Sequence, residues 1–167
     1  MPGTKQSNRS KKRGSGRDFT IVIGCGRLGA HIAALLSEEG KGVVVIDASR
    51  EAFLKLGPSF DGISLTGDAT ELAVLEEANI ENASAVIAVT GRDNTNIMVA
   101  QMARELYEVP HVIARLYEQE RECVYQELGI GTISPVLLST KEIEHILNPA
   151  SSGKSEIHSE DNTEAKE

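Results

Sequence analysis

Residues 21–29 read IVIGCGRLG, a short apolar run that leads directly into three glycines spaced G-x-G-x-x-G. When such a run is a buried strand and a helix opens behind it, the loop between them is suited to hold phosphate groups. Gly24 allows a tight turn out of the strand, and Gly26 lets a pyrophosphate approach the backbone without a Cβ in the way. Gly29 lets the helix pack closely on the sheet. The stretch therefore predicts a strand, a phosphate-binding loop and a helix.

A carboxylate follows this loop at the spacing that a bound nucleotide requires. Asp47 ends the next apolar run, GVVVID (42–47), 18 residues after Gly29. At that position a carboxylate accepts hydrogen bonds from the ribose hydroxyls and repels a 2′-phosphate, so NADP is disfavoured, although Arg50 nearby partly offsets this. NAD, NADH, ATP, ADP and AMP all carry the free ribose hydroxyls. The pair of motifs therefore predicts a dinucleotide or adenine-nucleotide site, with a vestigial site as the alternative.

Strand-like runs alternate with helical stretches along the body of the chain. Several runs are continuously apolar, as expected for strands buried on both faces of a parallel sheet. No two of them are joined by a tight hairpin turn, so antiparallel pairing has no local support. The sequence predicts an α/β fold, a doubly wound sheet of six parallel strands. The predicted strands are FTIVIG (19–24), GVVVID (42–47), GISLTG (62–67), AVIAVT (85–90), HVIARL (111–116) and TISP (132–135).

Four stretches between these runs predict helices. In the first, the spacing of Leu28, Ile32, Leu35 and Leu36 gives one apolar face, and Gly40 closes the helix. Asp68 and Glu71 are placed as a capping box at the start of the second helix, ahead of Leu72 and Leu75. The third opens at Asp93 or Asn94, runs through Met98, Met102 and Leu106, and is ended by Pro110. The fourth is a short amphipathic helix in EQERECVYQELG that stops at Gly129.

Length, composition and charge bound the function. At 167 residues and 40% apolar content, the chain fits one domain with one core. Residues 1–18 hold six basic residues and one acid, whereas residues 19–149 hold 9 basic and 19 acidic residues, a net of −10. The net negative charge of residues 19–149 argues against general nucleic-acid binding, which needs a basic surface. The basic leader, residues 1–17, is expected to be disordered, with a weak tether to an anionic membrane or an acidic partner as the alternative.

The sequence also predicts the compartment. No apolar run is long enough to span a bilayer, the N-terminus lacks a secretory signal, and Cys25 and Cys123 are expected to be reduced thiols. A cytoplasmic protein is the expectation. The acidic tail, residues 149–167, is expected to be disordered.

No catalytic set emerges from the residues. About 32 residues follow the sixth strand, too few for a substrate domain, and no tyrosine is followed by a lysine four residues later, as a single-domain reductase would require. Two isolated cysteines do not form a tetrathiolate zinc site. Cys25 is either a thiol with a pKa lowered by the helix N-terminus or simply a small residue tolerated in a glycine loop. We expect a protein that is not an enzyme and holds no metal.

Taken together, the motifs resemble the N-terminal lobe of the RCK domain, also called the TrkA-N or KTN domain. The resemblance covers residues 18–148 and rests on GCGRLG, VVVID, GDAT, AVIAVTGRDNTNI, VIARLYEQER and LGIGTISP in that order. Members of this family are cytosolic nucleotide-binding subunits that regulate potassium channels and the Trk and Ktr potassium transporters. The C-terminal lobe usual in the family has no counterpart here, which implies either a single-lobe subunit working beside a second one or a lobe located elsewhere.

The resemblance implies roles for individual residues. Gly24, Gly26 and Gly29 would cradle the phosphates, with backbone from Cys25 and Leu28, and Asp47 would hold the ribose. Arg27 would meet terminal phosphates, with a solvated helix-start arginine as its alternative; Arg115 would approach the nucleotide or a neighbouring subunit, with a surface ion pair as its alternative. Asp68 and Ala69 would line the adenine pocket, unless Asp68 serves as a helix cap, and Thr90 and Gly91 would face the crevice.

The family also implies assembly. Its members use a helix after the sixth strand to cross to a partner subunit, and residues 136–147 carry an apolar face with no sheet left to cover; packing back on its own domain is the alternative. The resemblance thus implies a homo-oligomeric subunit, dimer or larger ring, that binds NAD or NADH, or alternatively ATP or ADP. It would act peripherally at the inner face of the membrane on a potassium transporter or channel. The rival is a small NAD-dependent oxidoreductase that takes its substrate site from a partner chain.

Overall fold

The computed structural model describes residues 19–118 and 122–148. Both segments predicted to be disordered, residues 1–17 and 149–167, lie outside the described residues. The elements in chain order are β1 (Phe19–Ile23), α1 (Arg27–Glu38), β2 (Gly42–Asp47), η1 (Arg50–Lys55), β3 (Ile63–Thr66), α2 (Leu72–Glu77), η2 (Ile80–Asn82), β4 (Ala85–Ala88), α3 (Asp93–Gln101), η3 (Met102–Leu106), β5 (His111–Arg115), α4 (Glu122–Glu127), β6 (Gly131–Ile133) and α5 (Pro135–Leu147).

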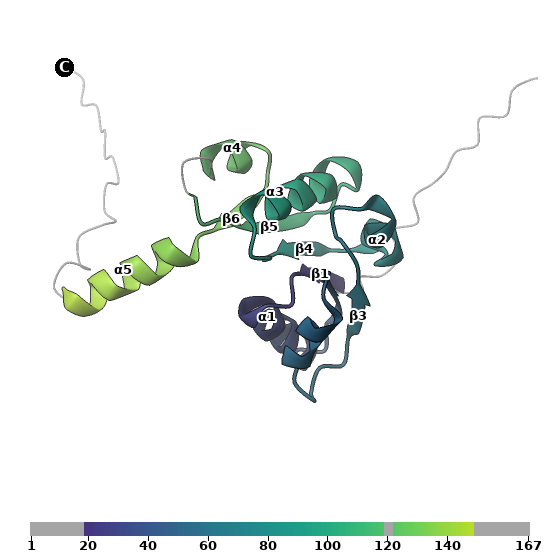
Figure 1. Ribbon diagram of the computed structural model, residues 1–167. Coiled ribbons are helices and arrows are strands. Elements are labelled where there is room, and N and C mark those ends of the chain that lie inside the picture. Colours follow the sequence, from purple (N-terminus) through teal and green to yellow (C-terminus); the bar gives the residue numbers. More distant parts are fainter. Residues whose placement is uncertain (1–18, 119–121, 149–167) are drawn as a thin grey trace, which may run out of the picture.

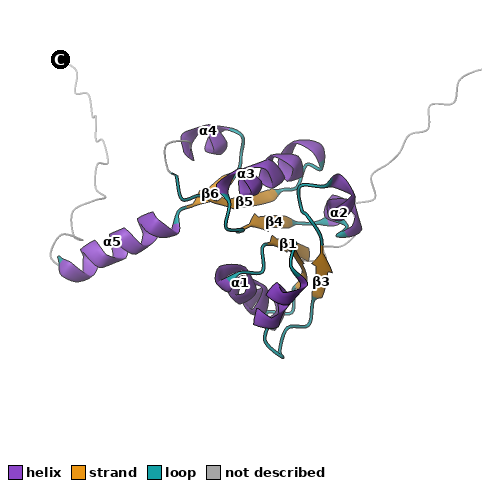
Figure 2. Cartoon of the chain, in the orientation of Figure 1, coloured by secondary structure: helices purple, strands orange, loops and turns teal. Residues whose placement is uncertain are grey.

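The six strands form one parallel sheet, as predicted. Their order is β3-β2-β1-β4-β5-β6, so the chain winds outward from β1 in one direction and then from β4 in the other. Figures 1 and 2 show α1 on one face of this sheet and α2, α3 and α4 on the other. This is a Rossmann-like doubly wound fold, and its switch point lies between β1 and β4.

Alternate residues of the central strands enter separate cores on the two faces of the sheet. In β1, Ile21 and Ile23 pack with α2 and α3, while Val22 packs with α1 and η1. All three side chains are essentially inaccessible to solvent. A strand buried on both faces needs apolar residues at every position, which explains why these runs read as continuous.

The first predicted helix forms with the expected C-terminus. Gly40 adopts a positive φ of 75°, its N–H donates to the Ser37 carbonyl at 2.9 Å, and the Lys41 N–H donates to the Leu36 carbonyl at 3.0 Å. These bonds satisfy the last carbonyls of α1.

The third predicted helix, from Asp93 or Asn94 through Met98, Met102 and Leu106, forms as α3 followed directly by η3. Met98 and Leu106 are exposed, and the buried positions of this segment are Asn96, Ile97, Val99, Ala100 and Ala103. Of Met98, Met102 and Leu106, only Met102 packs against the core. After Gln101 the helix widens into a π-helical turn, η3, and it ends at Leu106, before Pro110.

The last helix, α5, buries none of its residues. It projects away from the sheet beyond β6 (Figure 1), and Val136, Leu138, Ile143, Ile146 and Leu147 are 51–72% exposed. The alternative that this helix packs back on its own domain is therefore wrong. Ser134 is the N-cap of α5, and its hydroxyl accepts from the Leu137 N–H at 3.3 Å. Pro135 occupies the first turn, where no N–H group is needed.

Candidate nucleotide-binding site

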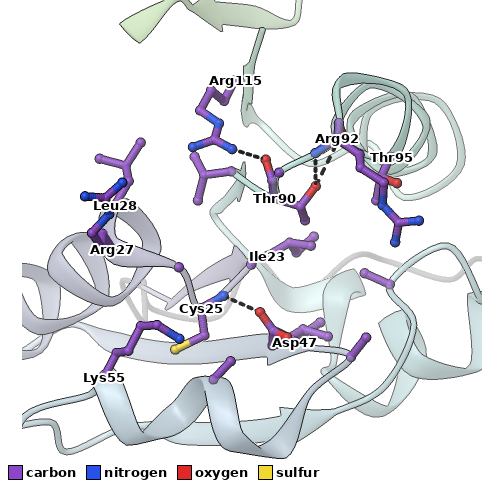
Figure 3. Close-up of a pocket in the computed structure, with 18 of the residues that line it drawn as sticks. Ile23, Cys25, Arg27, Leu28, Asp47, Lys55, Thr90, Arg92, Thr95 and Arg115 are labelled. Carbon is purple, nitrogen blue, oxygen red and sulfur yellow. Dashed lines mark hydrogen bonds between the residues drawn. The ribbon is translucent and has the colours of Figure 1, made fainter. Parts of the chain in front are cut away.

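A pocket of about 700 Å³ opens at the carboxyl ends of the strands, at the switch point between β1 and β4. Open α/β sheets bind their ligands at this place, and the volume lies within the usual range for small-molecule sites. Figure 3 shows side chains from both halves of the sheet converging on it. Of the twelve residues predicted for the site, eleven line it: Gly24, Cys25, Gly26, Arg27, Leu28, Asp47, Asp68, Ala69, Thr90, Gly91 and Arg115.

The three glycines of the loop are needed for different steric reasons. Gly24 has a φ of 99°, and a Cβ there would stand 2.9 Å from the Thr90 backbone. Gly29 lies outside the pocket lining; a Cβ there would stand 1.8 Å from the Gly24 carbonyl oxygen, so glycine is required for α1 to meet the loop. Gly26 is exposed, and a Cβ there would meet nothing within 4 Å. The space above Gly26 is thus open to a ligand.

Asp47 holds the loop against the end of β2. One carboxylate oxygen accepts from the Cys25 N–H at 2.7 Å, and the other accepts from the Ser49 N–H at 2.9 Å. Each oxygen keeps capacity for a further hydrogen bond. The carboxylate is consequently fixed at the pocket wall with acceptors left for hydroxyl groups.

Cys25 does not have the lowered pKa that its place at a helix start suggested. Its side chain is completely buried, and this burial, followed by the negative charge of Asp47, raises the pKa of the thiol; Lys55 opposes them only in part. The idea of an activated thiolate is wrong for this residue, which behaves as a small buried side chain within the loop.

The raised pKa of Cys25 predicts the pH dependence of stability. The thiol ionises first in the unfolded chain, at about pH 8.5, so its contribution to the free energy of unfolding is present below that pH and is lost as the pH rises toward the folded pKa. In a Cys123→Ser background, the difference in urea unfolding free energy between Cys25 and Cys25→Ser proteins should fall from pH 7 to pH 10. A difference that grows with pH would contradict the assignment.

Asp68 stabilises a turn rather than a helix end. Its Oδ1 accepts from both the Thr70 N–H at 2.9 Å and the Thr70 hydroxyl at 2.7 Å, and these bonds lower the pKa of the carboxyl. The N-cap of α2 is Glu71, without a side-chain cap bond. The predicted capping box of Asp68 and Glu71 is therefore wrong, because the Asp68 carboxylate accepts from Thr70, which precedes the helix.

The far wall of the pocket comes from β4 and β5. The Arg115 guanidinium donates to the Thr90 carbonyl and lies over the Tyr117 ring, 4.9 Å from its centroid. Its Nε is buried and has no acceptor within the described residues. The alternative of a surface ion pair for Arg115 is thus wrong for the described part of the chain. A buried Arg115 N–H group that has no acceptor among the described residues fits a pocket for an anionic ligand.

Positive charge is concentrated at this pocket. The described residues include eight lysines and arginines, and four of them line it, Arg27, Lys55, Arg92 and Arg115, against only two of the 18 carboxylates, Asp47 and Asp68. Arg27, Lys55 and Arg92 form no ion pair with any described residue. In a domain with a net charge this negative, such a distribution favours a ligand with several negative charges.

Sequence reasoning missed part of this lining, namely Lys55, Arg92, Thr95, Tyr117 and Pro135. It also missed Asn96, which lies buried behind Thr90. Within the described ranges, no group of three or more His, Cys, Asp and Glu side chains is arranged to hold a metal ion. Nor does any helix in those ranges have both the length and the apolarity to cross a membrane.

The TrkA-N domain family model matches residues 20–135. This chain belongs to the TrkA-N domain family. The prediction drawn from the motif order is therefore confirmed, and so is the Rossmann-like fold.

Among curated relatives, the chain is 41% identical over 130 residues to the Trk system potassium uptake protein TrkA of Streptomyces coelicolor, covering 78% of this chain and 58% of that protein. It is 36% identical over 110 residues to a TrkA homolog of Pyrococcus abyssi, covering 66% and 48%. The chain thus spans about half the length of these relatives.

Among solved structures, the GsuK RCK domain superposes with a TM-score of 0.69 at 26% identity, covering 83% of this chain and 30% of that one. GsuK has been solved bound to ADP and, as a channel, bound to NAD; each superposes with a TM-score of 0.67 at 26% identity. These matches cover 80% and 81% of this TrkA-N chain, and 34% and 24% of the respective GsuK chains.

Proposed function

We propose that this TrkA-N chain is a nucleotide-binding regulatory subunit of a potassium uptake system or channel, and not an enzyme. The observation that carries the proposal is the pocket: a glycine loop, a fixed carboxylate and four cations at the switch point of a TrkA-N fold. The named functions of the relatives support the same conclusion. The proposed domain is residues 18–148.

In this proposal the ligand is NAD or NADH, with ATP or ADP as the alternative. The phosphates would lie over Gly26 and the start of α1, whose N-cap lacks a side-chain acceptor for the first-turn N–H groups. Asp47 would accept from the ribose hydroxyls, and Asp68 and Ala69 would adjoin the adenine. Figure 3 draws Arg92 and Arg115 across the pocket from Asp47, where the second half of a dinucleotide or the terminal phosphates would extend.

Regulation would work through a population shift. A ligand changes an equilibrium between two assembly geometries only by as much as its affinities for them differ. A coupling of about 1–3 kcal/mol gives a useful response of about 5–150-fold. Tyr117 and Pro135 line the pocket, and Pro135 is the first residue of α5, so a ligand would contact the base of the projecting helix.

Potassium uptake by cells tests the function. Cells lacking this chain are complemented with the wild-type chain or with Gly26→Asp, and uptake is measured at limiting potassium. The proposal expects potassium uptake to fall in the deletion strain and to return with the wild-type chain. With the variant, uptake should stay below the wild-type level. Unchanged uptake in the deletion strain would contradict it. Turnover of NADH by the purified chain would instead favour the oxidoreductase.

The exposed face of α5 supports assembly with a second copy. Ile113 on β5 is also 38% exposed, on the face of the strand opposite the buried Val112 and Ala114. Two unpartnered apolar surfaces on one chain can be buried reciprocally in a symmetric dimer. The proposed assembly is a dimer or a larger ring at the cytosolic side of the membrane.

Charges on the apolar face of α5 should dissociate this assembly. We expect Ile143→Asp combined with Ile146→Asp to convert an oligomer into a monomer, because each carboxylate would be desolvated in the contact. Light scattering on a sizing column measures the mass. Thr140→Asp, on the same helix and also exposed, is the matched control and should leave the mass unchanged. An equal mass for the double variant and the wild-type chain would rule out this contact.

A further inference from the structure

One buried polar side chain stands directly behind the pocket wall. Asn96, in the second turn of α3, is completely inaccessible to solvent and does not line the pocket. Its neighbours at helical spacing, Val99, Ala100 and Ala103, are apolar residues of the core. A polar group in such a place must form its hydrogen bonds within the protein, because an unsatisfied buried amide is costly.

The Asn96 amide makes four hydrogen bonds, and all of them go to two residues of the pocket wall. Its Oδ1 accepts from the Thr90 N–H at 2.8 Å and from the Thr90 hydroxyl at 2.7 Å. Its Nδ2 donates to the Thr90 carbonyl at 3.1 Å and to the Arg115 carbonyl at 3.0 Å. Both donors and both lone pairs of the amide are therefore used.

These bonds determine where the far wall stands. Thr90 and Arg115 leave the ends of neighbouring strands, β4 and β5, and Asn96 joins the two ends. The Thr90 carbonyl that accepts from Asn96 also accepts from the Arg115 guanidinium. Thus one amide fixes the backbone of Thr90, the backbone of Arg115 and the acceptor that orients the Arg115 side chain.

We propose that Asn96 is a positioning residue for nucleotide binding: it holds Thr90 and Arg115 in place so that the Arg115 guanidinium faces the part of the ligand across the pocket from Asp47, the terminal phosphates or the second half of a dinucleotide. This inference rests on the proposed function, since it requires a nucleotide in the pocket. Asn96 touches no ligand itself, and its effect passes through Arg115 and Thr90. Aspartate at this position would keep the shape but lose both donors and place a negative charge beside two carbonyl oxygens.

The experiment is a mutant cycle on affinity, with ADP and NADH as the probes. Dissociation constants are measured for wild-type, Asn96→Asp, Asn96→Ala, Arg115→Ala and the Asn96→Ala/Arg115→Ala protein, each shown to be folded by its urea unfolding transition. Hydrogen bonds to charged groups predict a loss of about 10–150-fold for Arg115→Ala and for either Asn96 variant. In the Arg115→Ala background, Asn96→Ala should cost less than about threefold more, because its effect passes through the missing guanidinium.

Asn94→Asp is the matched control. It makes the same chemical change on the same helix at an exposed position outside the pocket lining, where the side chain holds neither Thr90 nor Arg115. It should leave both dissociation constants within about twofold of wild-type. Fully additive losses in the Asn96–Arg115 cycle would mean that Asn96 acts only on stability, and would overturn the inference. So would wild-type affinity in a folded Asn96 variant.

A measurement on the wild-type protein covers the case in which no Asn96 variant folds. Hydrogen exchange of the Asn96 side-chain amide, followed by NMR, should slow when ADP or NADH binds, because the ligand would hold Arg115 and Thr90 against it. An exchange rate unaffected by a saturating probe would overturn the inference while leaving the proposed function intact. Failure of wild-type chain to bind either probe would overturn the proposed function and this inference together.

Discussion

Replacing Gly29 with alanine is expected to destabilise the protein by more than about 4 kcal/mol, or to prevent folding altogether. The added Cβ would stand 1.8 Å from the Gly24 carbonyl oxygen and 3.0 Å from its carbonyl carbon, both backbone atoms of the loop. Alanine gains at most about 1 kcal/mol of helix propensity over glycine, which does not offset that overlap. Urea unfolding followed by circular dichroism measures the loss.

Gly57→Ala is the matched control for Gly29→Ala. A Cβ at Gly57 would have only the Ser59 hydroxyl oxygen nearby, at 4.0 Å. This substitution should be neutral or stabilising by up to about 1 kcal/mol, since it restricts the unfolded chain. If Gly29→Ala unfolds at the same urea concentration as Gly57→Ala, α1 does not meet the loop as closely as the structure has it.

Replacing Gly26 with aspartate is expected to weaken nucleotide binding by at least about 100-fold while leaving the protein folded. Gly26 is the N-cap of α1, with φ of −77° and ψ of −170°, and has open space where a Cβ would stand. Aspartate is a favoured N-cap and suits the positive end of the helix dipole, so stability should be maintained or increased. Its carboxylate would occupy the space proposed for the phosphates and repel them. Isothermal titration with ADP and NADH measures the loss.

Gly26→Ser separates charge from size in this experiment. Serine is an equally good N-cap without the charge, so it should match aspartate in stability and lose much less affinity. Equal losses for the two variants would indicate that steric blocking dominates. Wild-type affinity in Gly26→Asp would contradict the placement of the phosphates at the start of α1.

The sequence predicts the fold well because the relevant signals are local. The continuous apolar runs at β1 and β2, the glycine loop between β1 and α1, and Gly40 at the end of α1 each depend on a few neighbouring residues. Burial on both faces leaves no freedom in their hydrophobic pattern. The error at the start of α2 arises because one carboxylate has two possible roles: Asp68 bonds to Thr70 instead of capping α2.

The candidate site is predictable in part. Residues whose roles follow from the backbone motif, Gly24, Gly26 and Asp47, could be placed from spacing alone. Residues brought to the site by the tertiary fold could not be placed from spacing. Lys55, the last residue of η1, lines the pocket. Asn96 bonds to Arg115, 19 positions away, only because β4 and β5 are neighbours. The sequence does hold one signal for Asn96, an amide in register with Val99, Ala100 and Ala103 on an otherwise apolar helix face.

The measurement that tests the central claim most directly is an equilibrium titration of the purified wild-type chain with ATP, ADP, NAD and NADH, one at a time. The proposed site predicts saturable binding of at least one of them at one site per chain, with a mutual competition between any two that bind. It also predicts that a ligand at 100 times its Kd adds about 2.7 kcal/mol to the free energy of unfolding. No saturable binding of any of the four up to millimolar concentration would contradict the account.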